Sequence, residues 1–189
     1  FEDYIIEDPI KISSIVDSLN ELEPIYISSV YDGFAKAWKD KKHVPIERLL
    51  KSYKKLLENE TFCKEFTVKE SKALWTVNSV LRFIKSGVRD DDNAFDPSVN
   101  PLCYEIIEIL VEKVKPTGDY VSPADAYTRA INEPRGVLFE TAILWALREA
   151  RLAGENKDGI ERAWKKLYVL IKEPLESKAI DEISLHALI

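Results

Sequence analysis

Four aspartates fall within the seven positions Asp90–Asp96, and carboxylates this dense raise the question of a metal site. A hard cation such as Ca²⁺ needs several oxygens around one point. The calcium-loop pattern of EF-hands fails here, because no glycine stands at its sharp turn and no glutamate closes the loop. We therefore predict a solvated loop in which Asp96 caps the next helix, and no metal site.

Lysines gather at the end of one expected helix and along the next. They are Lys36, Lys39, Lys41 and Lys42, followed by His43, and then Lys51, Lys54 and Lys55. Two adjacent helix ends of this kind can hold a phosphate backbone, which makes Lys39, Lys42 and Lys54 candidate binding residues. The alternative is that these lysines offset helix dipoles and keep the surface soluble. Since the chain as a whole is acidic, the alternative is favoured.

Arg135 stands in the first turn of the helix expected after Pro134, where a cation opposes the helix macrodipole. A carboxylate is the ordinary compensation, and we expect Asp125, across the preceding loop, to supply it rather than Glu140. The functional alternative is a bound anion or the carboxylate of a partner protein. Arg135 is therefore a candidate binding residue, together with Asn132, which is expected to cap the same helix.

The residue types needed for catalysis do not occur in catalytic patterns. Neither His43 nor His186 has a cysteine, a histidine or a pair of carboxylates at ligand spacing, and no serine lies in a Gly-x-Ser-x-Gly elbow. A glycine-rich phosphate loop is also missing. We predict that the chain is not an enzyme and takes no cofactor.

Composition further limits the class of protein to which this chain can belong. The 189 residues include 27 Lys and Arg against 33 Asp and Glu, a net charge of −6, which argues against nucleic acid as the main partner. Cys63 and Cys103 form no CxxC motif and are expected to be buried thiols.

The sequence has no signal peptide and no long apolar run, which predicts a cytoplasmic protein without a membrane partner. The absence of methionine and the apolar stretch Ile183–Ile189 suggest a piece of a larger protein.

Proline positions and apolar spacing predict helices along the whole chain. Prolines suited to a first helical turn are Pro9, Pro24, Pro45, Pro97, Pro123, Pro134 and Pro174. Between them, apolar residues recur at i, i+3, i+4 and i+7. Strand-tolerant runs are limited to Tyr4–Ile6 and Phe62–Val68, without a hairpin partner. We predict an all-α fold of about nine helices in antiparallel pairs, as an irregular α-solenoid or a bundle.

This fold is expected to form one domain, 1–189. If the domain is divided, the boundary is expected near 87–96. Its central helix is expected within Ile131–Gly154, because Glu140 and Thr141 are the only polar residues between Val137 and Leu147. A helix so apolar must be covered on more than one side. Trp145 is therefore expected in the core, and Gly154 suits the C-terminal cap.

The stretch Ala124–Gly136, ADAYTRAINEPRG, resembles a pattern in the C-terminal α-helical regions of large bacterial defence-type P-loop NTPases. There an Ala-Ile-Asn is followed by Arg-Gly and a helix that begins like Leu-x-Glu-Ala. Here Thr141 separates Glu140 from Ala142, and Val137 replaces a residue that is often small or basic. The resemblance covers about 30 of the 189 residues. It implies a sensor or scaffold region whose ATPase lies elsewhere, so no catalytic residue carries over.

Together these observations predict a non-enzymatic helical interaction or sensor module, as a piece of a larger bacterial ATPase. Its partner would be another protein or the remainder of the larger chain. The alternative is a nucleic-acid-associated helical protein that uses the lysine-rich face of Lys36–Lys55.

Overall fold

The computed structural model describes residues 2–68, 71–115, 128 and 132–176. These ranges contain nine α-helices and three short 3₁₀ segments and no strand, so the predicted all-α class is confirmed. The elements are α1 (Glu2–Glu7), α2 (Pro9–Ile12), η1 (Ser13–Glu21), α3 (Pro24–Lys39), α4 (Ile46–Leu56), α5 (Glu60–Lys64), η2 (Glu65–Thr67), α6 (Lys72–Val88), η3 (Pro97–Val99), α7 (Asn100–Lys113), α9 (Pro134–Ala153) and α10 (Lys157–Glu176).

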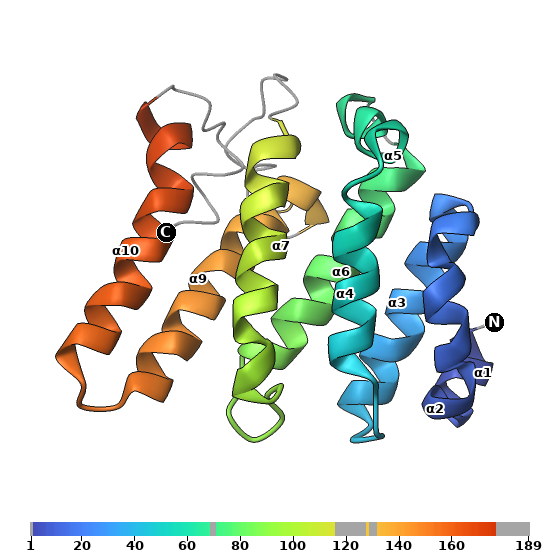
Figure 1. Cartoon of the computed structure of the whole chain (residues 1–189), viewed down its shortest axis with the longest axis horizontal. Helices are drawn as coiled ribbons and strands as arrows, with labels where there is room; N and C mark the ends of the chain where they lie inside the picture. Colours follow the sequence, from blue (N-terminus) through green and yellow to red (C-terminus); the bar gives the residue numbers. More distant parts are fainter. Residues whose placement is uncertain (1, 69–70, 116–127, 129–131, 177–189) are drawn as a thin grey trace.

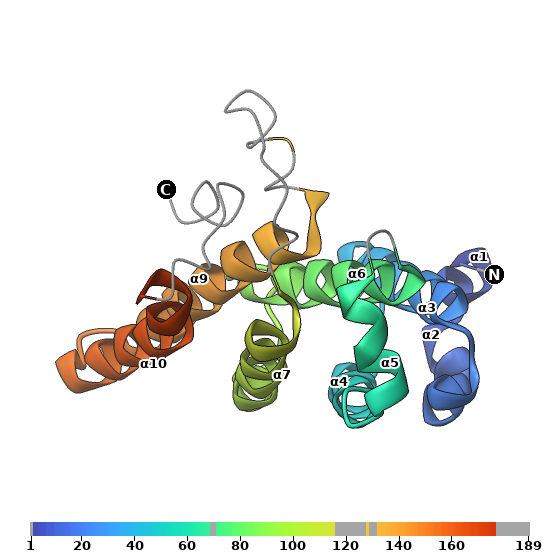
Figure 2. The ribbon, with the colours of Figure 1, turned by 90° about the horizontal axis from the view of Figure 1, so that it is seen from above.

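The long helices lie in two rows, seen side-on in Figure 1 and from above in Figure 2. One row contains α3, α6 and α9, and the other contains α4, α7 and α10. At one end of the α3–α6 contact the Thr76 hydroxyl donates to the Pro24 carbonyl at 2.6 Å. At the other end the Trp38 indole donates to the Asn93 carbonyl at 3.1 Å. Residue numbers rise together along the contact, so α3 and α6 run in the same direction.

The contact between α6 and α9 follows the same order. The Asn78 amide donates to the Asn132 carbonyl at 2.6 Å, and Lys85 Nζ lies 2.5 Å from a Glu140 carboxylate oxygen. All three helices of the first row are therefore parallel to one another. The antiparallel pairing of successive helices and the solenoid arrangement stay predictions.

Several helices begin where proline predicts. The helices α2, α3 and α9 start at Pro9, Pro24 and Pro134. The expectation for Pro174 is wrong, because this residue lies inside α10, which continues to Glu176. The missing proline N–H removes only one hydrogen bond there, at the very end of the helix. Pro123 lies outside the described residues.

The central helix is buried as predicted. Trp145 is 1% exposed, its ring centroid lies 4.9 Å from that of Tyr104, and its Nε1 donates to the Asn100 carbonyl at 3.0 Å. The helix ends at Ala153, and its C-cap, Gly154, has a φ of +58°, a backbone conformation that glycine adopts without strain. Both expectations for this helix, a core Trp145 and a glycine C-cap, are confirmed.

The segment after α6 joins three helices of the structure. The Phe95 N–H donates to the Gly87 carbonyl at 2.8 Å, and the Phe95 ring packs against Trp38 of α3 with ring centroids 5.1 Å apart. Asp91 forms ion pairs with Arg148 and with Arg151 of α9, the latter at 3.1 Å. The segment is thus fixed on one side to α3 and on the other to α9.

Two buried tyrosines of the α3–α4 contact differ in their hydrogen bonding. The Tyr31 hydroxyl donates to the Leu49 carbonyl at 2.7 Å. The Tyr53 hydroxyl is also buried but has no hydrogen-bond partner within the described structure. Burial raises the pKa of both phenols well above their usual range.

We expect Tyr53→Phe to raise the free energy of unfolding by about 1 kcal/mol, because it removes a buried polar group that lacks a partner. The matched change Tyr31→Phe should lower it by about 1 kcal/mol, because a hydrogen bond is lost. Urea denaturation followed by circular dichroism measures both. Equal losses for the two variants would contradict the assignment.

Candidate functional site

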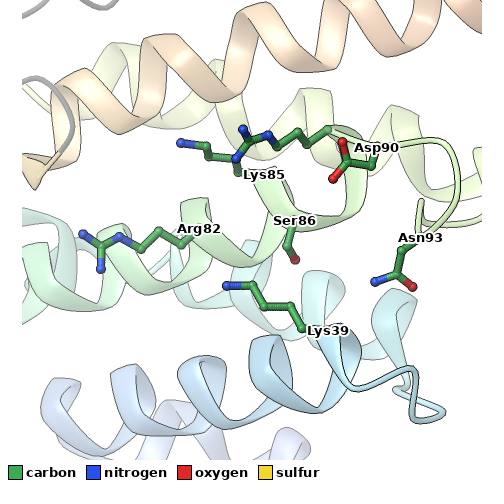
Figure 3. A pocket seen from close by; sticks show the side chains of 7 residues that line it. Lys39, Arg82, Lys85, Ser86, Asp90 and Asn93 are labelled. Atoms are coloured by element: carbon green, nitrogen blue, oxygen red, sulfur yellow. The ribbon is translucent and has the colours of Figure 1, made fainter.

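A pocket of about 390 Å³ lies between the C-terminal halves of α3 and α6 (Figure 3). Its lining consists of Lys39, Arg82, Lys85, Ser86, Arg89, Asp90 and Asn93. Four cationic side chains and one carboxylate give this lining a net charge of +3, whereas the whole chain carries −6. The pocket lining is therefore positively charged, although the whole chain is negatively charged.

Helical spacing on α6 positions most of these side chains. Arg82 and Lys85 lie three residues apart on α6, and Arg89, the C-cap, continues the spacing at i+7. The three side chains therefore share one face, while Phe83 and Ile84 on the other face of α6 are buried. Lys39, in the last turn of α3, faces them across the space between the two helices (Figure 3). The cations thus come from two parallel helices and the segment after α6.

Asn93 is held at the edge of the pocket by a reciprocal pair of hydrogen bonds. Its amide donates to the Trp38 carbonyl at 3.3 Å, and the Trp38 indole donates to the Asn93 carbonyl at 3.1 Å. Because Trp38 belongs to α3, this pair fixes the segment after α6 against the neighbouring helix. The shape of the pocket therefore depends on packing between α3 and α6.

Two carboxylates beside the pocket offset part of its charge. Glu140 binds Lys85 at 2.5 Å, and Asp32 lies close to Ser79 and Arg82. Burial raises the pKa of Asp32, while the Ser79 hydrogen bond and the Arg82 charge act in the opposite direction. With both carboxylates counted, the net charge falls from +3 to +1.

The C-terminal ends of α3 and α6 balance part of the remaining positive charge. Lys39 and Lys85 lie in the last turns of their helices, where cations balance the partial negative charge of the terminal carbonyls. Arg82 lies nearly two turns before the end of α6, beyond the reach of this effect. Arg82 is therefore the lining cation whose charge is least balanced by a helix end.

The structure places the three candidate lysines in three different surroundings. Lys39 lines the pocket. Lys42 Nζ donates to the carbonyls of Ile6 and Glu7 at the end of α1, the latter at 3.5 Å. Lys54 joins α4 to α7 through Glu105 at 2.8 Å.

The hydrogen bond that Lys54 donates to Glu105, together with the negative charge of Glu105, raises the pKa of Lys54. Lys42 and Lys54 thus bind other parts of the same chain and lie outside the pocket lining.

Arg135 is placed in the first turn of α9, as expected, and is only 5% exposed. Its Nη1 donates to the Val114 carbonyl at 2.5 Å, and its guanidinium carbon lies 5.2 Å from the Phe139 ring centroid. Val114 is the C-cap of α7, so the negative end of one helix compensates the cation. Asp125 lies outside the described residues, and Glu140 binds Lys85 instead.

The prediction that Asn132 caps α9 is wrong. The N-cap is Glu133, which has an extended backbone (φ −82°, ψ 146°) because it precedes Pro134. Asn132 instead donates its side-chain amide to the Thr128 carbonyl at 2.8 Å and accepts a hydrogen bond from Asn78. Because Pro134 occupies the first helical position, the N-cap is Glu133, one residue after the predicted Asn132.

The aspartate-rich segment forms structural contacts. Asp96 accepts a hydrogen bond from the Ser98 N–H at 2.9 Å, which confirms the predicted cap. Desolvation acts to raise the pKa of Asp91, but hydrogen bonds and charges of Arg151 and Arg148 outweigh it and hold that pKa below its usual range. Among the residues that the structure describes, no group of three or more His, Cys, Asp or Glu could hold a metal ion.

The sequence interpretation missed Arg82, Lys85 and Arg89. Their spacing of three and four residues on one helix face was a usable signal. It was less conspicuous than the run of lysines at Lys36–Lys42, of which Lys39 alone lines the pocket.

Comparison with protein-family models, with curated proteins and with solved structures finds no match for this chain. The resemblance to the helical regions of P-loop NTPases therefore stays a prediction. Within the described ranges, no helix has both the length and the apolar character needed to cross a membrane.

Proposed function

We propose that this chain is a non-enzymatic interaction module, and that the pocket between α3 and α6 binds carboxylates of an acidic protein segment. One observation supports the proposal most: four cationic side chains converge on a single pocket in a chain of net charge −6. The acidic segment belongs either to a separate protein or to the remainder of a larger chain.

The chemistry of the lining favours carboxylates. Guanidinium groups such as those of Arg82 and Arg89 match the planar geometry of a carboxylate and can bind it with two parallel hydrogen bonds. A volume of about 390 Å³ is near the lower end for ligand pockets, which suits one or two acidic side chains. Ser86 and Asn93 supply further polar groups at the pocket wall.

Nucleic acid is the second candidate, because phosphates also bind clustered arginines and lysines. A long phosphate backbone would have to pass the carboxylates of Asp32, Asp90 and Glu140, which lie in or beside the pocket. It would also approach a molecule of net negative charge. The carboxylates favour a short acidic peptide over an extended polyanion, and the net negative charge repels both ligands but repels the more highly charged one more strongly.

We expect a fluorescein-labelled peptide of ten glutamates to bind, and the double charge reversal Lys39→Glu/Arg82→Glu to weaken binding at least about tenfold. Fluorescence anisotropy at low and at moderate ionic strength measures the affinity, which should fall as salt rises. Circular dichroism checks that each variant is folded.

The matched control is Lys51→Glu/Lys165→Glu, which makes the same change in net charge at two exposed lysines outside the pocket. Equal weakening by the control, or no binding by the wild-type chain, would contradict the proposal. If a single-stranded RNA or a DNA duplex of matched charge binds more tightly and loses its affinity in the pocket variant alone, the nucleic-acid function is correct instead.

A further inference from the structure

The exposed face of α6 continues from the pocket toward the start of the helix. Its exposed residues are Lys72, Trp75 and Arg82, and the exposed C-cap Arg89 follows them. Trp75, Arg82 and Arg89 are spaced by seven residues, which is close to two helical turns, so they form one line along the helix. Arg82 and Arg89 line the pocket. Trp75 stands on the same line, about 10 Å from Arg82 along the helix axis.

Trp75 is not a core residue of α6. It is 50% exposed, and the buried side of this part of the helix is formed by Ala73, Val77 and Val80. A tryptophan so placed leaves a large, flat apolar surface in water, and tryptophan is enriched among the residues that dominate binding between proteins. Since the positively charged pocket begins two turns away, one ligand can contact both the aromatic surface and the cations.

The charges along this line are suited to an acidic ligand over its whole length. Lys72 stands in the first turn of α6, which contains no acidic residue. A cation at this position adds to the partial positive charge of the helix N-terminus instead of balancing it. Asp32 lies close to Arg82 and offsets part of its charge. Trp75 nevertheless has a cation on each side of it along the helix.

We infer that the acidic segment bound by the pocket carries an aromatic residue three positions from its first bound carboxylate, and that this residue stacks on Trp75. The inference rests on the function proposed for the pocket. An extended peptide advances by about 3.3 Å per residue, so three residues span the distance of about 10 Å between Arg82 and Trp75. Stacking removes apolar surface of both rings from water, and the carboxylate fixes the register.

A single strand of nucleic acid is favoured less, although its bases also stack on tryptophan. Proteins that bind such strands provide several aromatic side chains on which successive bases stack. The exposed face of α6 has one, and Asn78 and Ser79 lie between Trp75 and Arg82. One ring at a fixed distance from the cations suits one aromatic residue of an acidic peptide.

Two fluorescein-labelled peptides test the inference. The first is Phe-Gly-Gly followed by six glutamates, the second has alanine in place of phenylalanine, and both carry the label at the glutamate end. Fluorescence anisotropy should show that the wild-type chain binds the phenylalanine peptide about five- to tenfold more tightly. Trp75→Ala should abolish this difference and leave the affinity for the alanine peptide unchanged within about twofold, which also shows that the variant is folded.

The matched control is Trp164→Ala, which removes a 43% exposed tryptophan from α10 and should leave the difference between the peptides intact. Lys39→Glu/Arg82→Glu should weaken both peptides at least about tenfold. If the wild-type chain binds neither peptide, the function proposed for the pocket is wrong and the inference with it.

Three other outcomes would overturn the inference and leave the proposed function standing. They are equal affinity of the wild-type chain for the two peptides, a difference that persists in Trp75→Ala, and an equal loss of the difference in Trp164→Ala. If Trp75→Ala weakens binding of a single-stranded oligothymidylate but not of the phenylalanine peptide, the aromatic surface binds bases instead.

Discussion

Replacing Trp145 with alanine is expected to lower the free energy of unfolding by about 3–5 kcal/mol. The side chain is almost entirely buried in α9 and packs against Tyr104 of α7. The change would open a large cavity between these helices. It would also leave the Asn100 carbonyl without the indole hydrogen bond at 3.0 Å.

Trp164→Ala is the matched control, since it removes the same side chain from an exposed position on α10. It should cost less than about 1 kcal/mol. Chemical denaturation followed by circular dichroism measures both variants. A loss below about 1 kcal/mol for Trp145→Ala would mean that α9 is peripheral to the core.

The second large effect is expected at Gly87, near the end of α6. Helix propensity alone predicts that Gly87→Ala stabilises the chain by up to about 1 kcal/mol. However, a Cβ atom at this position would overlap the ring atoms of Phe95. That ring cannot move aside easily, because Trp38 and Phe83 pack against it with centroids 5.1 Å away. We therefore expect a net loss of about 2–3 kcal/mol.

A double-mutant cycle separates the two contributions at Gly87. Phe95→Ala by itself should cost about 3–5 kcal/mol, because it empties a buried site. In that background the overlap is gone, so Gly87→Ala should gain about 0.5–1 kcal/mol from helix propensity. Urea denaturation of the four proteins gives the cycle. If Gly87→Ala is stabilising in the presence of Phe95, the close contact described here is wrong.

Features that depend on a residue and its near neighbours could be predicted from the sequence. Pro24 and Pro134 mark helix starts because proline is preset for the first turn. Gly154 ends α9 because it tolerates a positive φ. The burial of Trp145 followed from an apolar run too wide for one face of a helix.

The candidate site could not be predicted in the same way, because it depends on packing between segments distant in sequence. Lys39 and Arg82 are 43 positions apart and meet only because α3 and α6 pack side by side. Arg135 donates a hydrogen bond to the carbonyl of Val114, and a sequence pattern does not reveal which main-chain oxygen lies within reach of a side chain. Val114 lies within reach because α7 ends beside the first turn of α9.

If the pocket binds an acidic segment as proposed, the short segment after α6 has a thermodynamic consequence for that binding. Arg89, Asp90 and Asn93 line the pocket, while Asp91, between them, holds Arg148 and Arg151 of α9. A ligand that fixes this segment also favours its attachment to α9, and by reciprocity a firmer attachment favours the ligand by the same factor. Weakening the Asp91 ion pairs would therefore lower affinity at the pocket without altering any residue that lines it.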